Sequence, residues 1–218
     1  MCGRFTLVTE KRVLELLFEI ELMEEITSRY NIAPSEMLLA LRCSPHSGQK
    51  ELIRLQWGLI PSWAKNKFTG GGLINIRAET AAVKFSNAFR WRRVLIPASG
   101  FYEWRKEGKS KQPYYIYRQD SRPFAFGGLY ESGRRELKRP QNCAIITTAA
   151  NSLIASIHHR MPLIIPEELY PLWLDPGTPT TELQKMLLPY PAEKMDVYPV
   201  SKLVNNPAFD HPDCLRKE

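Results

Sequence analysis

The second residue of the chain, Cys2 in MCGRF, offers a reactive group. Removal of Met1 would leave it with an α-amine and a thiol on adjacent carbon atoms, and their ordinary pKa values of about 8 and about 8.5 keep both usable at neutral pH. Such an aminothiol can trap an aldehyde, because the amine forms an imine and the thiol then closes a thiazolidine ring. It can also hydrolyse an amide, with the amine as base for the thiol. A buried and inert cysteine is the other interpretation.

Two further segments place polar groups among apolar ones. In LINIRAET (73–80) Asn75 and Arg77 alternate with isoleucines, so they would share one face of an extended chain. The Asn amide can orient a carbonyl or an amine, and the Arg fork can bind a phosphate. In SGFYEW (99–104) aromatic neighbours would desolvate Glu103 and raise its pKa, as a general acid at neutral pH requires. An exposed polar face and a surface glutamate are the alternatives.

Histidines and a tryptophan complete the candidate groups. In SIHHRMP (156–162) His158 or His159 could transfer protons near neutral pH, and we expect only one to act because adjacent side chains should point differently. A histidine that complements a helix terminus is the alternative. Trp63, in the turn of WGLIPSW beside the Gly-rich loop 65–72, could stack on an unpaired base or belong to the core.

The bulk composition indicates a globular protein of the reducing cytoplasm. Of 218 residues, 44% are hydrophobic and 24% are charged. No apolar run reaches the roughly 18 residues of a membrane-spanning helix, and the N-terminal stretch lacks the pattern of a secretory signal. The four cysteines form neither a C-x-x-C pair nor a zinc spacing. We therefore expect free thiols, no metal and no cofactor in a protein that is not secreted.

Positive charge is unevenly distributed along the chain. The net charge is +7, but residues 84–111 carry eight basic and two acidic side chains, while residues 1–28 carry three basic and six acidic ones. A local excess of positive charge is typical of proteins that bind a phosphate-bearing partner. A solubilising basic face is the alternative.

The elements that must position these residues are short. Apolar spacing predicts a helix over 9–20 with Thr9 as its cap, and further short helices over 151–159 (capped by Asn151), 166–174 and 181–188. Runs of β-branched and aromatic residues predict strands over 51–57, 92–104, 113–118, 123–130 and 143–149. The pattern predicts one α+β domain over residues 1–218, with a core of about 2–205 and a short C-terminal tail. We expect a curved, mainly antiparallel sheet or open barrel with peripheral helices.

Several segments, in their order along the chain, resemble the SRAP (SOS-response-associated peptidase) family. They are MCGRF, YNIAP (30–34), WGLIPSW (57–63), INIRAET (74–80), SGFYEW (99–104), TTAAN (147–151), IHHRMP (157–162) and PVSKLVN (199–205). The resemblance spans nearly the whole chain. It implies a monomeric, DNA-associated protein that senses and shields abasic sites in single-stranded DNA. The link it implies is a covalent thiazolidine crosslink through Cys2 after Met1 is removed.

The same resemblance assigns roles to residues. It implies a catalytic set of Cys2, Asn75, Glu103 and His158, in which Asn75 orients the amine or the sugar. Glu103 would transfer protons during sugar ring opening and imine formation, and His158 would assist, including in reversal of the link. The expected DNA contacts are Arg4, Trp63, Arg77 and Thr148. The family also implies weak lyase activity and an autopeptidase activity that removes Met1, although a housekeeping aminopeptidase could remove it as well.

One departure and two other functions stay open at this point. Some family members carry a second aromatic residue after the turn tryptophan, whereas Ala64 follows Trp63 here, so DNA contacts at this turn are expected to differ. The first alternative is an N-terminal-nucleophile amidohydrolase, such as a glutaminase, with the Cys2 amine as base and an oxyanion hole that contains Asn. The second is a non-catalytic reader of single-stranded or modified DNA.

Overall fold

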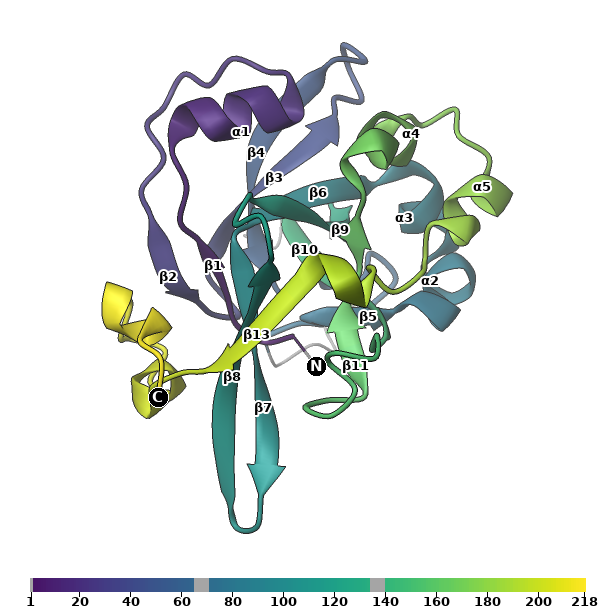
Figure 1. The fold of residues 1–218 in the computed structure, drawn as a ribbon. Helices are drawn as coiled ribbons and strands as arrows, with labels where there is room; N and C mark the ends of the chain where they lie inside the picture. The colour runs from purple at the N-terminus through teal and green to yellow at the C-terminus, as the bar shows by residue number, and fades with distance from the viewer. Residues whose placement is uncertain (1, 65–70, 134–139) are drawn as a thin grey trace.

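Two β-sheets dominate the computed structural model, which describes residues 2–64, 71–133 and 140–218 (Figure 1). The smaller sheet has the strand order β13-β8-β7-β1-β2 and is antiparallel throughout. Its strands are β1 (Phe5–Leu7), β2 (Arg29–Ile32), β7 (Gly100–Glu107), β8 (Ser110–Arg118) and β13 (Met195–Pro199). Because β1 lies between β2 and β7, the start of the chain is held inside a sheet.

The larger sheet closes on itself. Its order is β11-β10-β4-β3-β6-β9-β12, and β9 also pairs with β10, so that β10, β4, β3, β6 and β9 form a ring. Strand β10 additionally holds β5 in parallel. The strands are β3 (Met37–Cys43), β4 (Lys50–Trp57), β5 (Asn75–Arg77), β6 (Arg93–Ala98), β9 (Phe124–Glu131), β10 (Asn142–Ala149), β11 (Arg160–Pro162) and β12 (Ile164–Ile165).

These sheets confirm the predicted α+β class with mainly antiparallel strands; the β10–β4 and β10–β5 pairings are parallel. The predicted strand runs correspond to β4, β8, β9 and β10, each with slightly different ends. The run predicted over 92–104 is instead two strands. The chain bends at Ser99, so that β6 enters the larger sheet and β7 enters the smaller one.

Short helices flank the sheets. They are α1 (Lys11–Phe18), α2 (Ala78–Lys84), α3 (Ser86–Trp91), α4 (Tyr170–Leu174) and α5 (Thr180–Lys185), with 3-10 turns η2 (Glu167–Leu169), η3 (Ala192–Lys194), η4 (Lys202–Asn205) and η5 (Pro212–Leu215). In Figure 1, α1 lies beside β3 and β4, and α2 to α5 gather on the opposite side. No helix in the described ranges is long and apolar enough to cross a membrane.

Two helix predictions are wrong in detail. The first helix begins at Lys11, with Glu10 rather than Thr9 at the cap position and no side-chain cap hydrogen bond. Residues 151–159 form turns instead of a helix. Asn151 does accept a hydrogen bond from the Ile154 amide at 3.0 Å, as a cap would, but Arg160 pairs with β10 directly afterwards and draws the chain into an extended strand.

A shared aromatic core joins the two sheets. The Phe5 ring from β1 contacts Trp57 of β4 and Phe126 of β9, with ring centroids 5.4 Å and 5.5 Å apart. All three side chains are buried. Because burying such rings stabilises the packed state strongly, Phe5 fixes the position of the residues that precede it. The N-terminal segment is therefore anchored next to the centre of the molecule.

The turn that carries Trp63 leaves the larger sheet where two backbones nearly touch. Gly58 has φ +147° and Gly72 has φ +77°. A Cβ atom at Gly58 would lie 2.0 Å from the Gly71 carbonyl oxygen, so only glycine fits there. The Gly-rich loop predicted over 65–72 lies largely outside the described residues, which resume at Gly71.

Candidate functional site

Cys2 lies fully buried just before β1. Its thiol Sγ is 3.8 Å from the Arg4 carbonyl oxygen. Its own carbonyl accepts a hydrogen bond of 2.8 Å from Asn75 Nδ2. The first strand and the segment around residue 75 therefore meet at Cys2, although 73 positions separate the two residues.

The Asn75 amide is held at one end only. Strand β5 pairs with β10 opposite Ile145, which fixes the Asn75 backbone, and Nδ2 is used by Cys2. Its Oδ1 atom is buried and has no hydrogen-bond partner among the described residues. Burying an amide oxygen without a hydrogen-bond partner costs about 1–3 kcal/mol, because the oxygen loses its hydration. The open end of this side chain is thus an acceptor, suited to a ligand O–H or N–H.

Glu103 is a buried carboxyl group that interacts electrostatically with Cys2. It lies on β7, is 2% exposed, and burial raises the pKa of its carboxyl. Burial likewise raises the pKa of the Cys2 thiol, and the Glu103 charge raises it further. The two acids therefore share one desolvated region in which ionising both is unfavourable. The assumption of an ordinary thiol pKa, made from the sequence, is wrong for this folded state.

His158 and His159 stack on each other, with ring centroids 4.4 Å apart and planes at 26°. The expectation that adjacent histidines point differently is therefore wrong, because they follow a turn rather than lie in the regular helix predicted for them. Burial lowers the pKa of His158, and the charge of His158 lowers the pKa of His159. His158 Nδ1 lies 3.0 Å from the Arg160 amide and 3.2 Å from the Arg160 carbonyl oxygen, so the ring tautomer decides which of these two groups it binds.

An ion pair that the sequence did not reveal joins two of the motifs. Arg160, 8% exposed, donates to Glu79 Oε1 at 2.5 Å and to Oε2 at 3.0 Å, and also to the Thr147 carbonyl. Glu79 belongs to α2, directly behind β5, and Arg160 opens β11. Both strands flank β10, so the pair clamps the Asn75 segment to the His158 turn. The only sequence signal was one opposite charge in each motif.

Replacing Glu79 with alanine is expected to lower the free energy of unfolding by about 1–3 kcal/mol, because it leaves the buried Arg160 guanidinium short of acceptors. Urea denaturation measures this difference. The control is Lys185→Ala, which removes the exposed pair with Glu182 and should change stability little. Equal stability of the Glu79 variant and the unmodified protein contradicts the clamp.

The predicted DNA contacts differ in how far they reach the surface. Trp63 is 66% exposed, and Arg77 is exposed at the end of β5. Thr148 is only 4% exposed, and its hydroxyl donates to the Leu187 carbonyl at 3.1 Å. A direct contact between Thr148 and DNA therefore requires its neighbours to move.

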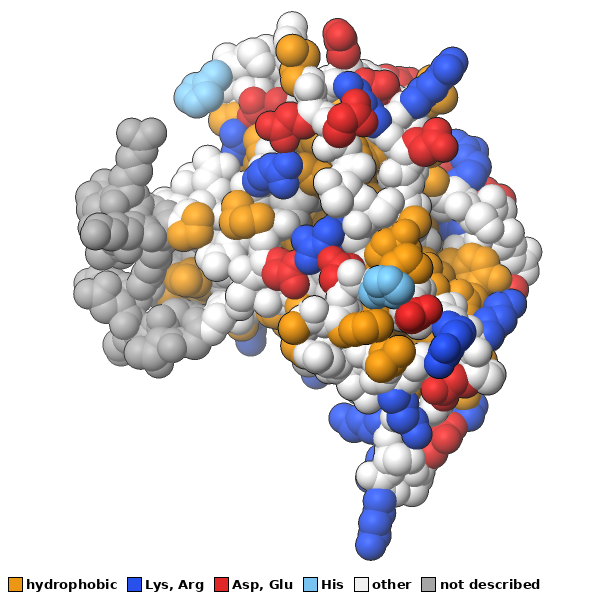
Figure 2. Space-filling model, turned by 90° about the vertical axis from the view of Figure 1, so that its left-hand side faces the viewer, with side chains coloured by type: hydrophobic (Ala, Val, Ile, Leu, Met, Phe, Trp, Pro, Cys, Tyr) orange, Lys and Arg blue, Asp and Glu red, His pale blue; other side chains and the backbone are white. Residues whose placement is uncertain are grey.

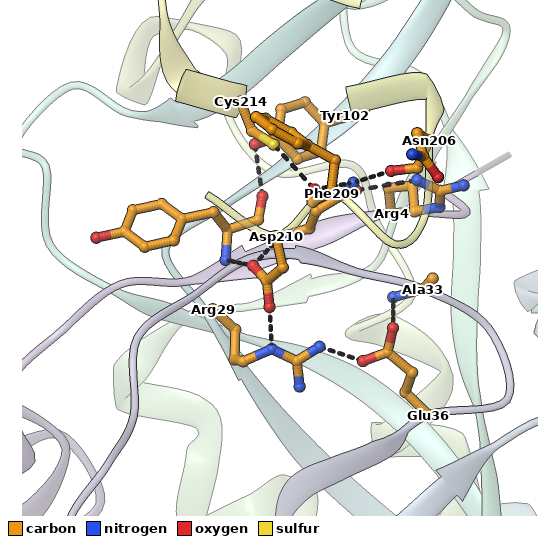
Figure 3. Close-up of polar contacts among 11 residues, drawn as sticks. Arg4, Arg29, Ala33, Glu36, Tyr102, Asn206, Phe209, Asp210 and Cys214 are labelled. Atoms are coloured by element: carbon orange, nitrogen blue, oxygen red, sulfur yellow. Dashed lines mark hydrogen bonds and ion pairs between the residues drawn. The ribbon is translucent and has the colours of Figure 1, made fainter. Parts of the chain in front are cut away.

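Arg4 is tied to the C-terminal segment (Figure 3). Its Nη1 donates to Asn31 Oδ1 at 3.0 Å and to the Val204 carbonyl at 2.9 Å. The Asn31 amide in turn donates to the carbonyls of Val204, Asn206 and Phe209. No described residue accepts a hydrogen bond from Arg4 Nε or Nη2, so this fixed guanidinium keeps donors for another acceptor.

Comparison with known proteins places this site in context. The family model for SOS response associated peptidase (SRAP) matches residues 1–207. The abasic site processing protein YoqW of Bacillus subtilis is 41% identical over 223 residues, which cover 99% of each chain. The abasic site processing protein YoaM of the same organism is 40% identical over 226 residues, covering 100% of this chain and 99% of YoaM. A crystal structure from Bacteroides thetaiotaomicron superposes with a TM-score of 0.78 at 25% identity, with both chains fully covered.

Proposed function

The chain belongs to the SOS response associated peptidase (SRAP) family, and from this premise we propose that it processes abasic sites in DNA. The proposed product is a covalent thiazolidine link between Cys2 and the sugar of an abasic nucleotide in a single strand. The observation that carries the proposal is the contact of Asn75 Nδ2 with the Cys2 carbonyl, beside the buried Glu103. Once Met1 is removed, these residues would bring an aminothiol, a hydrogen-bond acceptor and an acid together in a buried region.

The first step forms an imine. An abasic sugar opens to an aldehyde at C1′, and the Cys2 α-amine attacks that carbon once Met1 has been removed. Loss of water from the adduct requires a proton for the departing oxygen. The protonated Glu103 carboxyl, with its raised pKa, supplies that proton. Asn75 Oδ1 accepts a hydrogen bond from the amine or from a sugar hydroxyl and so orients the reacting pair.

The second step closes the ring. The S–H bond breaks, an S–C1′ bond forms, and the C=N electron pair moves to nitrogen, which takes up a proton. Because burial keeps the thiol protonated, the amine reacts first and the thiol follows. The proton relay runs through Glu103 and His158, whose lowered pKa keeps it neutral near pH 7.

Ring closure explains the use of a thiol. An imine at C1′ acidifies C2′ and leads to β-elimination, which breaks the DNA strand. Addition of the thiol removes the imine and stops that reaction. The protein thereby shields the lesion. Its weak lyase activity comes from the fraction of imine that undergoes β-elimination before the ring closes.

DNA would be held by the groups that reach the surface. We propose that Arg77 and the free donors of Arg4 bind phosphates next to the lesion, and that Trp63 stacks on a base. Thr148 would contribute only after its neighbours move. Exposure of the Cys2 amine, by self-cleavage or by an aminopeptidase, is a precondition of the reaction.

The geometry of Asn75 favours crosslinking over amide hydrolysis. An oxyanion hole needs an N–H donor aimed at the substrate. Here Nδ2 already binds the Cys2 carbonyl, and the open end of the amide is an acceptor, which would repel an oxyanion. The same end suits a sugar hydroxyl or an amine.

One gel experiment tests the proposal. Met1-free protein is mixed with a single-stranded oligonucleotide that carries one abasic site, and separated under denaturing conditions. We expect a shifted band with abasic DNA, and none with undamaged DNA or with a borohydride-reduced site that has no aldehyde. Salt-sensitive binding to undamaged DNA without a covalent band would instead identify a reader. Release of ammonia from glutamine without a band would identify an amidohydrolase.

A further inference from the structure

The β7–β8 hairpin projects beyond the rest of the molecule (Figure 1). Its last strand pair is Glu107 with Ser110, and the two-residue turn Gly108–Lys109 joins the strands. Gly108 has φ +60°, as such a tight turn requires. The outer part of the hairpin is exposed on both strands from Lys106 to Lys111. This part can be reached by a partner from several directions.

The hairpin tip concentrates positive charge that no described residue neutralises. Lys106 pairs directly opposite Lys111, and Lys109 lies in the turn between them. Like charges at directly opposite positions destabilise a strand pair. The nearby Glu107 carboxylate is bound by Arg105 at 2.5 Å, and within the described ranges no carboxylate forms a salt bridge with any of the three lysines. The surface at the bottom of Figure 2 is accordingly rich in basic side chains.

Two other basic residues of the segment 84–111 form contacts within the protein. Arg92 pairs with Glu131 at 3.1 Å, and Arg93 is 4% exposed and donates to backbone carbonyls, including that of Trp173 at 2.6 Å. These two arginines therefore stabilise the fold. The unpaired share of the positive charge found in the sequence lies in large part at the hairpin tip.

The same strand connects the tip to the proposed reaction site. Strand β7 carries Glu103 at its inner part, and Lys106 follows three residues later, about 10 Å away at roughly 3.4 Å per residue. Lys106 lies on the same sheet face as Tyr102. The Tyr102 amide donates a hydrogen bond of 3.0 Å to the Arg4 carbonyl. Along β7 the tip therefore begins about 10 Å from Glu103, a distance that a single DNA strand spans within a few nucleotides.

We propose that Lys106, Lys109 and Lys111 bind the phosphate backbone of the DNA that flanks the abasic nucleotide. A polyanion at the tip removes the repulsion between Lys106 and Lys111, so the charge pair that destabilises the free hairpin favours the bound state. This inference rests on the proposed function for the identity of its partner. It extends the interface from the lesion to the neighbouring nucleotides.

The test uses equilibrium binding to a single-stranded oligonucleotide with a tetrahydrofuran abasic analogue, which lacks the aldehyde and cannot crosslink. The variant Lys106→Gln/Lys111→Gln is compared with Lys185→Gln/Lys194→Gln, which removes the same charge from exposed positions elsewhere. Each lost phosphate contact lowers the slope of log K against log salt by about 0.7 for a single strand. We expect the slope to fall by about 1.4 in the hairpin variant and to stay unchanged in the control.

A second variant separates binding from folding. Lys106→Glu places opposite charges across the strands, so the melting temperature without DNA should rise while affinity for the oligonucleotide falls. A salt slope that equals that of the unmodified protein overturns the inference, even if crosslinking is intact. If crosslinking is absent while the hairpin variant still lowers the slope, the proposed chemistry fails and the hairpin contact stands.

Discussion

Replacing Cys2 with serine is expected to abolish the covalent band completely. A serine keeps the α-amine, so the imine still forms, but its hydroxyl does not close a stable ring at neutral pH. The imine then persists and drives β-elimination, so strand cleavage should rise as the crosslink disappears. Cys2→Ala should behave in the same way, since it also keeps the amine. Denaturing gels with an end-labelled abasic oligonucleotide measure the band and the cleaved strand together.

The matched control for this change is Cys43→Ser. Cys43 is half-buried at the end of β3, and its thiol contacts the Gly48 carbonyl at 3.3 Å, away from the site. This variant loses one thiol and should crosslink as the unmodified protein does. Intact-mass measurement must show the loss of Met1 from each protein compared. A Met1-free Cys2→Ala protein with neither crosslink nor cleavage would count against an attack by the amine.

Strands that are rich in β-branched and aromatic residues could be predicted from the sequence. Strands β4, β8, β9 and β10 are rich in β-branched and aromatic residues and were found close to their predicted bounds. Pairing could not be predicted in the same way. That β5 lies beside β10 in parallel depends on contacts across about 70 positions, for which local periodicity carries no signal. The helix predicted over 151–159 was wrong for the same reason, because strand pairing at Arg160 overrides the local helix preference.

The sequence indicated several residues that the fold brings together, but not how burial and long-range contacts change them. Asn75 contacts Cys2 directly, and burial raises the pKa of Glu103, the direction that the sequence predicted. The thiol pKa was misjudged because burial of Cys2 depends on packing around the end of β1. The Glu79–Arg160 pair was missed because 81 positions separate its partners. Desolvation and long-range ion pairs both require the three-dimensional fold.

Replacing Glu103 with glutamine is expected to slow crosslink formation by about 100- to 10,000-fold, the usual contribution of general acid–base catalysis. Glutamine keeps the shape and an N–H donor but cannot give up a proton to the departing water. Single-turnover crosslinking rates at saturating abasic DNA measure this step apart from binding. Glu168→Gln, at an exposed position of turn η2, removes the same charge elsewhere and should leave the rate unchanged.

The pH dependence gives the sharper test, because it separates catalysis from structure. Burial raises the folded-state pKa of Glu103, so its acid form is lost as pH rises through that pKa, and the crosslinking rate should fall on the alkaline side. The glutamine variant has no such group and should lack this fall. The same raised pKa means that Glu103 favours folding below its unfolded pKa and loses that contribution as pH rises through the folded value. Glutamine should therefore raise stability at high pH while it lowers activity. A variant that loses both stability and rate together contradicts an acid role and leaves only a packing role.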